Sequence, residues 1–383
     1  MRVACIATSQ IPSRSANSIR VMKVSQALTR LGHEVCLWVP ADGQEASWDG
    51  LAQHYGMKVR FEIRRMTAWP PLRRWDFSLR AVLDSVRWQP DLWYAWPYQA
   101  AAALSQLGRP TILEVHDRPA GAAGPMLFRL FLRGAGARRL LVITEALRSW
   151  LQERYRSALR PPFTLVTPSG VDLESYEGLP APAEARERLG WPQRFTVSYT
   201  GHLYEGRGLD LMVELARRRP QVAFVWAGGE PEAVRSWKER LSQSHVNNIR
   251  LLGFVPQTEL PMVHAASDAL LMPYARAIAV SSGGDTAAFA SPMKAFEYMA
   301  AGRPILASRL PVLLEVLSSD NAILLEPEEV EAWDAALRQV VADPDLRARL
   351  GGAARREAAR YSWLERTRRA LDGLQIPAGR GPR

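Results

Sequence analysis

Cysteine and lysine are scarce in this chain, and long apolar runs are absent. Two cysteines among 383 residues, Cys5 and Cys36, supply neither a disulfide framework nor the repeated spacing of a zinc site. Both lie in apolar, strand-like runs, so we expect two buried free thiols. Lysine occurs four times against 45 arginines, so a basic residue of this chain is nearly always arginine and each lysine is an exception.

No apolar run approaches the roughly 18 residues that a membrane-spanning helix needs. Residues 1–7 are too short for a signal peptide and are typical of a first strand. We therefore expect a cytoplasmic protein. Peripheral contact with the inner face of a membrane stays open, because the charge balance would favour it.

Positive charges exceed negative charges by ten, and much of the surplus lies near the carboxyl end. Residues 347–383 contain ten arginines and three acidic residues. Such a balance suits a polyanion or an anionic membrane surface. However, the chain has no zinc-finger, RNA-recognition or basic-zipper signature, and its basic end lacks aromatic residues at stacking intervals. A nucleic-acid partner is therefore disfavoured.

Short apolar runs alternate with helical patterns along the chain. Strands are predicted at 3–8, 34–39, 58–64, 91–95, 111–115, 140–144 and 163–167, and again at 195–199, 222–227, 249–252, 269–272, 305–307 and 322–325. Unalternating apolar strands separated by helices belong to parallel sheets covered on both faces. The pattern restarts after 167–172, which predicts an α/β fold of two Rossmann-like doubly wound domains, 1–170 and 171–360.

The segment 291–304 is typical of a short helix that carries charges its structure does not require. Ser291 suits the N-cap, Pro292 the first helical position and Gly302 the end, so we predict a helix from about 292 to 301. Lys294 then lies in the first turn, where the helix dipole disfavours a cation unless an anion binds there. Glu297, on the same face, could accept hydrogen bonds from vicinal hydroxyls; the two could equally form a solvated surface pair.

A second segment, 199–208, follows the predicted strand 195–199 and opens another helix. A strand, a glycine-bearing turn and a helix start together form an anion site from backbone N–H groups. Arg207 could add a charged contact to the same anion. With Lys294, this segment predicts a site for a nucleoside diphosphate.

In their order and residues, the two segments resemble the donor site of the retaining glycosyltransferases of family 4. The family pattern Gly-Arg-Leu-x-x-x-Lys-Gly is similar to Gly201-His202-Leu203-x-x-x-Arg207-Gly208, and its Glu before Met-Ala-x-Gly-x-Pro is similar to Glu297-Tyr298-Met299-Ala300-Ala301-Gly302-Arg303-Pro304. Two positions depart from the pattern. His202 replaces the family's Arg, and Phe289 stands where an earlier Glu would be.

The resemblance implies the B-type glycosyltransferase fold, in which two such domains face a cleft. The carboxyl-terminal helix, 361–376, would return to the first domain. In the second domain, Gly201, Arg207 and Lys294 would bind the donor diphosphate and Glu297 would bind the ribose.

The activity implied is transfer of a hexose-like sugar from a nucleoside diphosphate to a glycan, lipid-linked or small-molecule acceptor, with the anomeric configuration kept. Cationic groups would stabilise the leaving diphosphate, so we expect neither a metal nor a cofactor beyond the donor itself. Asp285 is a candidate for the contact to the transferred sugar that Phe289 cannot make. The alternative is a non-catalytic nucleotide-binding protein on the same scaffold. The expected process is cell-envelope or polysaccharide biosynthesis.

Candidate residues in the first domain follow predicted strands or precede helices. His116 follows the strand 111–115, and in the family a His at the matching strand end lies near the reacting sugar, which makes His116 the catalytic candidate. A structural His bonded to Asp117 or to backbone is the alternative. Ser15 and Asn17, in the loop before the first helix, are candidate acceptor contacts or simply the helix N-cap.

Two further segments, 69–77 and 126–133, mix arginine with large apolar residues. Such segments could contact lipid headgroups or a lipid-linked glycan. They could also be a loop and a core helix. The helical spacing of Phe128, Phe131 and Leu132 favours a core helix for the second.

Overall fold

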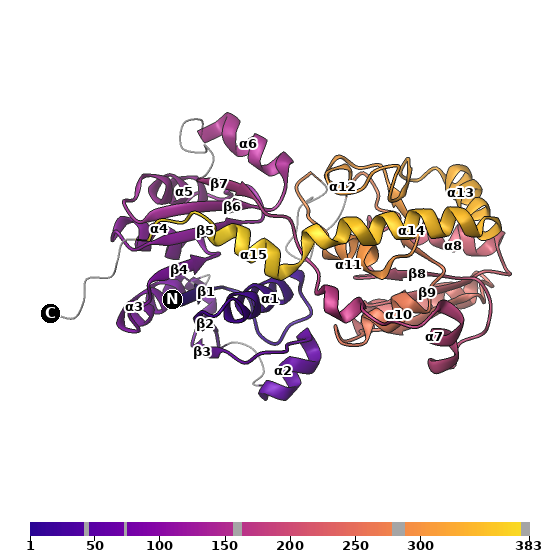
Figure 1. Ribbon diagram of the computed structural model, residues 1–383, viewed down its shortest axis with the longest axis horizontal. Coiled ribbons are helices and arrows are strands. Elements are labelled where there is room, and N and C mark those ends of the chain that lie inside the picture. The colour runs from indigo at the N-terminus through magenta and orange to yellow at the C-terminus, as the bar shows by residue number, and fades with distance from the viewer. Residues whose placement is uncertain (42–45, 73–74, 156–162, 278–287, 377–383) are drawn as a thin grey trace. The chain divides into compact units, whose positions relative to one another are not determined.

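Two parallel sheets organise the part of the chain that the computed structural model describes, residues 1–41, 46–72, 75–155, 163–277 and 288–376 (Figure 1). One sheet lies in unit 1, formed by Met1–Ser169 and Trp363–Arg383, and the other in unit 2, Gly170–Ser362. Both are wound with alternating helices. The predicted α/β class with two Rossmann-like domains is confirmed.

Unit 1 has the strand order β3-β2-β1-β4-β5-β6-β7, all parallel. Its strands are β1 (Arg2–Ile6), β2 (Glu34–Pro40), β3 (Glu62–Met66), β4 (Leu92–Ala95), β5 (Thr111–Val115), β6 (Ala137–Val142) and β7 (Thr164–Val166). Its helices are α1 (Ala16–Arg30), α2 (Trp48–Tyr55), α3 (Trp75–Arg87), α4 (Tyr98–Gln106), α5 (Gly124–Arg133), α6 (Glu145–Tyr155) and the carboxyl-terminal α15 (Trp363–Leu371). The order reverses between β1 and β4.

The central strands β1, β2 and β4 of unit 1 are largely apolar and buried on both sides, as expected for a parallel sheet whose two faces are covered by helices. On one face, Cys36 and Trp38 of β2 pack in a buried cluster with Phe77 of α3 and Leu104 of α4. Cys5 and Cys36 are buried free thiols, as predicted. Helices α3 and α4 therefore cover the same face of this sheet.

Unit 2 has the strand order β10-β9-β8-β11-β12-β13, again parallel. Its strands are β8 (Thr196–Thr200), β9 (Ala223–Ala227), β10 (Ile249–Gly253), β11 (Ala269–Met272), β12 (Ile305–Ser308) and β13 (Ile323–Leu325). Its helices are α7 (Pro182–Arg188), α8 (Leu209–Arg218), α9 (Pro231–Gln243), α10 (Leu260–Ala265), α11 (Met293–Ala301), α12 (Pro311–Leu314), α13 (Val330–Ala342) and α14 (Pro344–Ala358). Here the order reverses between β8 and β11.

Several predicted strand limits differ from the structure, and local hydrogen bonds explain two of these differences. β3 begins at Glu62 rather than at Lys58, whose backbone N–H donates to the Gln26 side chain instead of joining the sheet. β6 ends at Val142 rather than at Thr144, because the Thr144 hydroxyl accepts a backbone hydrogen bond from the first turn of α6.

Candidate functional site

The candidate site of unit 2 lies where its strand order reverses. Gly201 directly follows β8, and Tyr274 lies just beyond the carboxyl end of β11. Lys294 comes from the first turn of α11 and reaches both of them. In doubly wound sheets, ligands bind in the crevice outside the strand ends at this reversal point.

Lys294 is buried, with only 9% of its surface exposed. Its ammonium lies 3.8 Å from the ring centroid of Tyr199 and 5.2 Å from that of Tyr274. It has no hydrogen-bond partner among the residues that the structure describes. Burial, with the nearby Arg207 charge, holds the pKa of Lys294 well below its usual value, while Glu297 acts in the opposite direction. Lys294 is therefore not part of a solvated surface pair.

Arg207 approaches the same aromatic ring as Lys294. Its guanidinium carbon lies 4.8 Å from the Tyr274 ring centroid, and its buried Nε lacks a partner within the described ranges. Two cations that share one ring repel each other. An arrangement of this kind is suited to an anion that binds between them.

The turn after β8 needs glycine at two positions. Gly201 has φ +135°, and a Cβ there would lie 2.6 Å from the Lys294 ammonium. Gly208, at the start of α8, has φ +71°, and a Cβ there would lie 1.8 Å from the Pro273 carbonyl oxygen. Glycine thus lets the turn pack tightly against both α11 and the end of β11.

Helix α11 differs in one detail from its prediction. It begins at Met293 with Pro292 as N-cap, so the prediction of Ser291 as the cap is wrong. Proline at this position has no side-chain hydrogen bond to offer the first turn, which leaves the backbone N–H groups there without a side-chain cap. The predicted end is confirmed, since Gly302 adopts the left-handed conformation with φ +65°.

Glu297 lies one turn after Lys294 and is half-buried. Its charge opposes the larger effects of burial and Arg207, which together lower the pKa of Lys294. Asp285, the candidate for the missing sugar contact, lies outside the described residues. Phe289 is described and buried, and it places an apolar ring where the family has a carboxylate.

A buried polar network behind the site was missed by sequence reasoning. The Tyr176 hydroxyl lies 3.1 Å from Nδ1 of His264, whose Nε2 lies 3.3 Å from the Thr200 hydroxyl. The Thr200 backbone N–H donates to the Tyr298 hydroxyl at 2.8 Å, which ties α11 to β8. The network joins four separate segments of the chain, so no local motif could have revealed it.

Because His264 is fully buried, unit 2 should lose stability in acid. Burial, and then the charge of Lys294, lower the pKa of His264 to about 3, against about 6.5 in an unfolded chain. Between these two pH values His264 is protonated in the unfolded state and neutral in the folded state. The free energy of unfolding therefore falls as pH drops below about 6.5, by up to about 1.4 kcal/mol per pH unit. Urea unfolding at several pH values measures this slope.

The matched variants for that experiment are His264→Gln and His245→Gln, the second at an exposed position. We expect the slope between pH 6.5 and 4 to decrease in the first variant and to match the wild type in the second. An unchanged slope in His264→Gln would contradict the assignment, whatever the variant's absolute stability.

In unit 1, His116 follows β5 and pairs with a carboxylate of that same strand. Its Nε2 lies 2.7 Å from Oε1 of Glu114, so its carboxylate partner is Glu114 and not Asp117, which the structural alternative names beside the backbone. Residues two apart in a strand share a face, which explains the pairing. Burial, and then Arg20, lower the pKa of His116 to about 4, so its ring is neutral at pH 7. When Nε2–H donates to Glu114, Nδ1 is left as an acceptor.

Ser15 is the N-cap of α1, and its hydroxyl accepts a hydrogen bond from the Ser18 backbone N–H at 3.3 Å. Asn17 is exposed in the first turn of that helix. The structure thus gives Ser15 a structural role. Contact of either residue with an acceptor stays a prediction. Ser15, Asn17 and His116 belong to unit 1, whereas Gly201, Arg207, Lys294 and Glu297 belong to unit 2.

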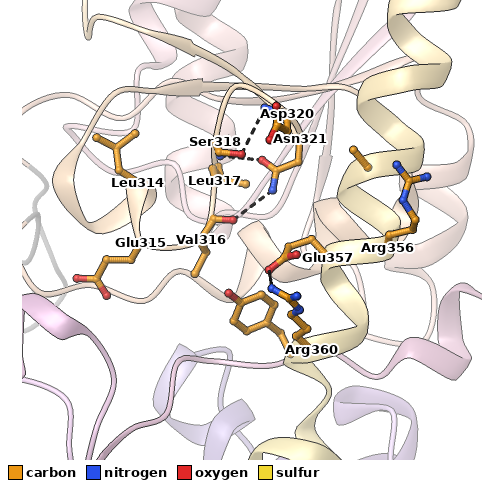
Figure 2. Close-up of a pocket in the computed structure, with 12 residues that line it drawn as sticks. Leu314, Glu315, Val316, Leu317, Ser318, Asp320, Asn321, Arg356, Glu357 and Arg360 are labelled. Atoms are coloured by element: carbon orange, nitrogen blue, oxygen red, sulfur yellow. Dashed lines mark hydrogen bonds and ion pairs between the residues drawn. The ribbon is translucent and has the colours of Figure 1, made fainter.

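A cavity of about 470 Å³ lies elsewhere in unit 2, between the segment after α12 and helix α14 (Figure 2). Its walls mix acidic and basic side chains, including an ion pair of Glu357 with Arg360 at 3.2 Å. The Ser318 backbone N–H donates to the Asn321 side chain at 2.9 Å and shapes one wall. None of the described donor candidates, Gly201, Arg207, Lys294 and Glu297, lines this cavity, and its charges favour no particular ligand.

Neither metal clusters nor membrane spans occur in the described ranges. No three or more His, Cys, Asp or Glu side chains there gather in a group that could hold a metal ion. Asp343 and Asp345, two aspartates separated by one residue, belong to a helix start. The Asp343 side chain accepts a hydrogen bond from the Leu346 backbone N–H at 2.9 Å and so caps α14. No described helix is long and apolar enough to cross a membrane.

Two doubly wound units, with a cationic site at the reversal point of the second, define the class of B-type glycosyltransferases. Comparison with known families agrees. The family described as Glycosyl transferases group 1 matches residues 183–357, and Glycosyltransferase Family 4 matches residues 18–175. The chain belongs to the group 1 glycosyltransferases of the family 4 type.

Curated relatives include the GDP-mannose-dependent alpha-(1-6)-phosphatidylinositol monomannoside mannosyltransferase of Mycolicibacterium smegmatis, 27% identical over 88% of this chain and 88% of that protein. The D-inositol 3-phosphate glycosyltransferase of Xylanimonas cellulosilytica is 30% identical over 54% of this chain, which spans 50% of that protein.

Solved structures share the fold over nearly the whole chain. HepE of Anabaena, in complex with UDP, has a TM-score of 0.73 and 17% identity over 97% of this chain and 99% of that one. Sucrose-phosphate synthase of Thermosynechococcus elongatus has a TM-score of 0.71 and 18% identity over 96% of each chain.

Proposed function

We propose that this glycosyltransferase binds the diphosphate of a nucleotide sugar between Arg207 and Lys294. The observation that supports this is the buried ammonium of Lys294, which has no acceptor among the described residues and lies against the Gly201 turn. A buried cation without a partner is costly to the free protein. A doubly charged diphosphate would compensate both cations at once.

The proposed roles of the two cations follow from where negative charge develops during sugar transfer. The bond between the anomeric carbon and the diphosphate oxygen breaks, and the diphosphate gains negative charge as it leaves. Arg207 and Lys294 are positioned to stabilise that charge more strongly than they stabilise the intact donor. The acceptor hydroxyl attacks from the same face and passes its proton to the leaving phosphate, so the anomeric configuration is retained. Family membership supports retention.

The remaining assignments in the donor site extend this proposal. Glu297 accepts hydrogen bonds from the ribose hydroxyls, and no cofactor beyond the donor takes part. Metal independence is part of the proposal, since Arg207 and Lys294, which share the Tyr274 ring, would supply the positive charge that a metal ion would otherwise bring to the diphosphate. His116, with a neutral ring held by Glu114, is the catalytic candidate of unit 1.

We propose a hexose donor and a glycan, lipid-linked or small-molecule acceptor of cell-envelope or polysaccharide synthesis. The mannosyltransferase relative is named for GDP-mannose and for a phosphatidylinositol mannoside, and this chain spans 88% of it. HepE of Anabaena, the structural neighbour described above, was also solved with UDP-glucose. These names define the first donors to test.

The proposal predicts slow donor hydrolysis that a chelator does not stop. Purified protein is incubated with a panel that includes GDP-mannose and UDP-glucose, with and without EDTA, and released nucleoside diphosphate is measured. We expect turnover of at least one donor at equal rates in both conditions. Turnover that requires a divalent cation would contradict the metal-independent mechanism. Diphosphate binding without turnover of any donor would favour a non-catalytic nucleotide-binding protein.

Glu297 provides a sharper variant, which is tested by ligand binding. Glu297→Gln is expected to weaken nucleoside diphosphate binding about tenfold, because a charged acceptor of hydroxyl hydrogen bonds is replaced by a neutral one. Titration calorimetry with the diphosphate and its 2′,3′-dideoxy analogue tests the assignment. If the wild type binds both ligands equally, Glu297 does not contact the ribose. Glu239→Gln, exposed on α9, is the control.

A further inference from the structure

Large apolar side chains are exposed on one part of unit 1. Within the described ranges, only Met1 and Leu314 among the exposed large apolar residues lie outside the stretch 69–130. Single exposed leucines are ordinary on a protein surface. A concentration of exposed leucine, tryptophan and methionine in one stretch of the chain is less ordinary, and exposed apolar side chains that gather in a patch are typical of interaction sites.

Helix α3 carries an apolar stripe toward solvent in addition to its buried one. Phe77 and Ala81 face the core of unit 1. Trp75, Leu79 and Leu83, at intervals of four residues, are 43%, 60% and 54% exposed. Residues four apart lie on one face of a helix, so these three form a continuous stripe. The fold does not need it, because the core already uses the other side of α3.

The stripe continues toward two neighbouring helices of unit 1. Helix α4 packs against both α3 and α5. On α5, Phe128 and Phe131 are buried, which confirms the predicted core helix, while Met126 and Leu130 are exposed. The outward faces of α3, α4 and α5 therefore form one layer, here called the α3–α5 surface.

Charge on the α3–α5 surface is of one sign. Arg129 and Arg133 of α5 are exposed, and neither α4 nor α5 contains an acidic residue. The two acids of α3 are engaged within the unit. Asp76 pairs with Arg80, and Asp84 accepts hydrogen bonds from Trp38 and Arg64. What reaches solvent is an apolar stripe with arginines beside it.

We propose that the α3–α5 surface docks on a lipid bilayer that contains anionic phospholipids. Leucine and methionine enter the boundary between headgroups and acyl chains, tryptophan lies at the headgroup level, and arginine contacts lipid phosphates. A second copy of this chain fits less well, because pairing two such surfaces would bring arginines against arginines. The inference deepens the proposed function, since it favours a lipid-linked acceptor, but vesicle binding is measured independently of turnover.

Vesicle sedimentation tests the surface directly. The full chain is mixed with vesicles of phosphatidylcholine alone or with an equal part of phosphatidylglycerol, and the pelleted fraction is measured against lipid concentration. We expect binding to the mixed vesicles that weakens as salt is raised. The double variants Leu79→Gln/Leu83→Gln and Arg129→Gln/Arg133→Gln are each expected to lower the binding constant about tenfold or more.

Matched controls come from unit 2. Leu314→Gln makes the same chemical change at a position 43% exposed, and Arg235→Gln removes an exposed arginine of α9. Both should bind as the wild type does. Thermal unfolding confirms that each variant is folded, and the single variant Leu83→Gln replaces the double if it is not.

Several results would overturn the inference. They are the absence of wild-type binding to any vesicle, equal binding by the α3–α5 variants, or a dimer in light scattering that Leu79→Gln/Leu83→Gln dissociates. A chain that turns over a donor but does not bind vesicles overturns the docking surface alone. A chain that binds vesicles through this surface but turns over no donor overturns the proposed function alone.

Discussion

Lys294→Met is expected to lower kcat/KM for donor turnover by about 10²–10³-fold, the usual cost of removing one group that stabilises a leaving anion. The variant keeps the length of the side chain and removes its charge. Arg207 remains against Tyr274 but can no longer share the diphosphate with a second cation. Thermal shift with nucleoside diphosphates should lose most of its ligand-dependent component at the same time.

The same substitution should stabilise the free protein. The Lys294 ammonium is buried beside Arg207 without a hydrogen-bond partner in the described part of the chain, and a thioether against the Tyr199 ring has no such desolvation cost. We expect the free energy of unfolding to rise by about 1–2 kcal/mol, measured by urea denaturation without ligand.

A variant that lowers kcat/KM and raises the free energy of unfolding indicates that Lys294 serves binding and not packing. Lys238→Met, at an exposed position of α9, is the control and should change neither quantity. If Lys294→Met lowers stability and leaves kcat/KM intact, Lys294 is a structural residue and the proposed donor site is wrong.

Glu114→Gln is expected to destabilise the protein by about 3–5 kcal/mol, because it leaves a buried arginine without its counter-charge. Oε1 of Glu114 lies 2.8 Å from a terminal nitrogen of Arg366, and both side chains are almost wholly buried. Arg366 comes from α15, so this pair ties the carboxyl-terminal helix to β5 within unit 1. The Tyr94 hydroxyl donates to the other carboxylate oxygen.

A double-mutant cycle tests the pair. Arg366 also donates to the Pro168 carbonyl oxygen at 2.8 Å, so Arg366→Met alone has its own cost. Glu114→Gln/Arg366→Met should nonetheless cost less than the two single changes together, because no unpaired charge is then buried. Additive costs would contradict the pairing. Glu145→Gln, which breaks an exposed pair with Arg148, should cost at most about 1 kcal/mol.

The pH dependence of this pair has a definite sign. Although burial acts to raise the pKa of Glu114, Arg366 and His116 outweigh it and hold that pKa below its ordinary value. A carboxylate whose folded pKa is lowered stabilises the protein above its unfolded pKa of about 4.3 and loses that contribution as pH falls further. In Glu114→Gln, the additional loss of stability below that pH should be smaller than in the wild type.

The sequence by itself determined the doubly wound class and predicted the two segments whose cations the structure brings to one aromatic ring. Apolar runs without alternation require sheets covered on both faces, whatever the details of packing. Gly201, Gly208 and Gly302 marked turns because few other residues adopt a positive φ. These are local properties, since each depends on a residue and its immediate neighbours in the chain.

Only the tertiary structure decided where charge and apolar surface finally lie. That Lys294 is buried against Tyr199 and Tyr274, that Glu114 meets Arg366 from the far end of the chain, and that Leu79 and Leu83 face solvent all depend on contacts between distant segments. Periodicity shows that α3 has apolar residues on two sides, but it cannot show which side the core takes. Burial and pairing across the fold are set by packing, and packing is a property of the whole chain.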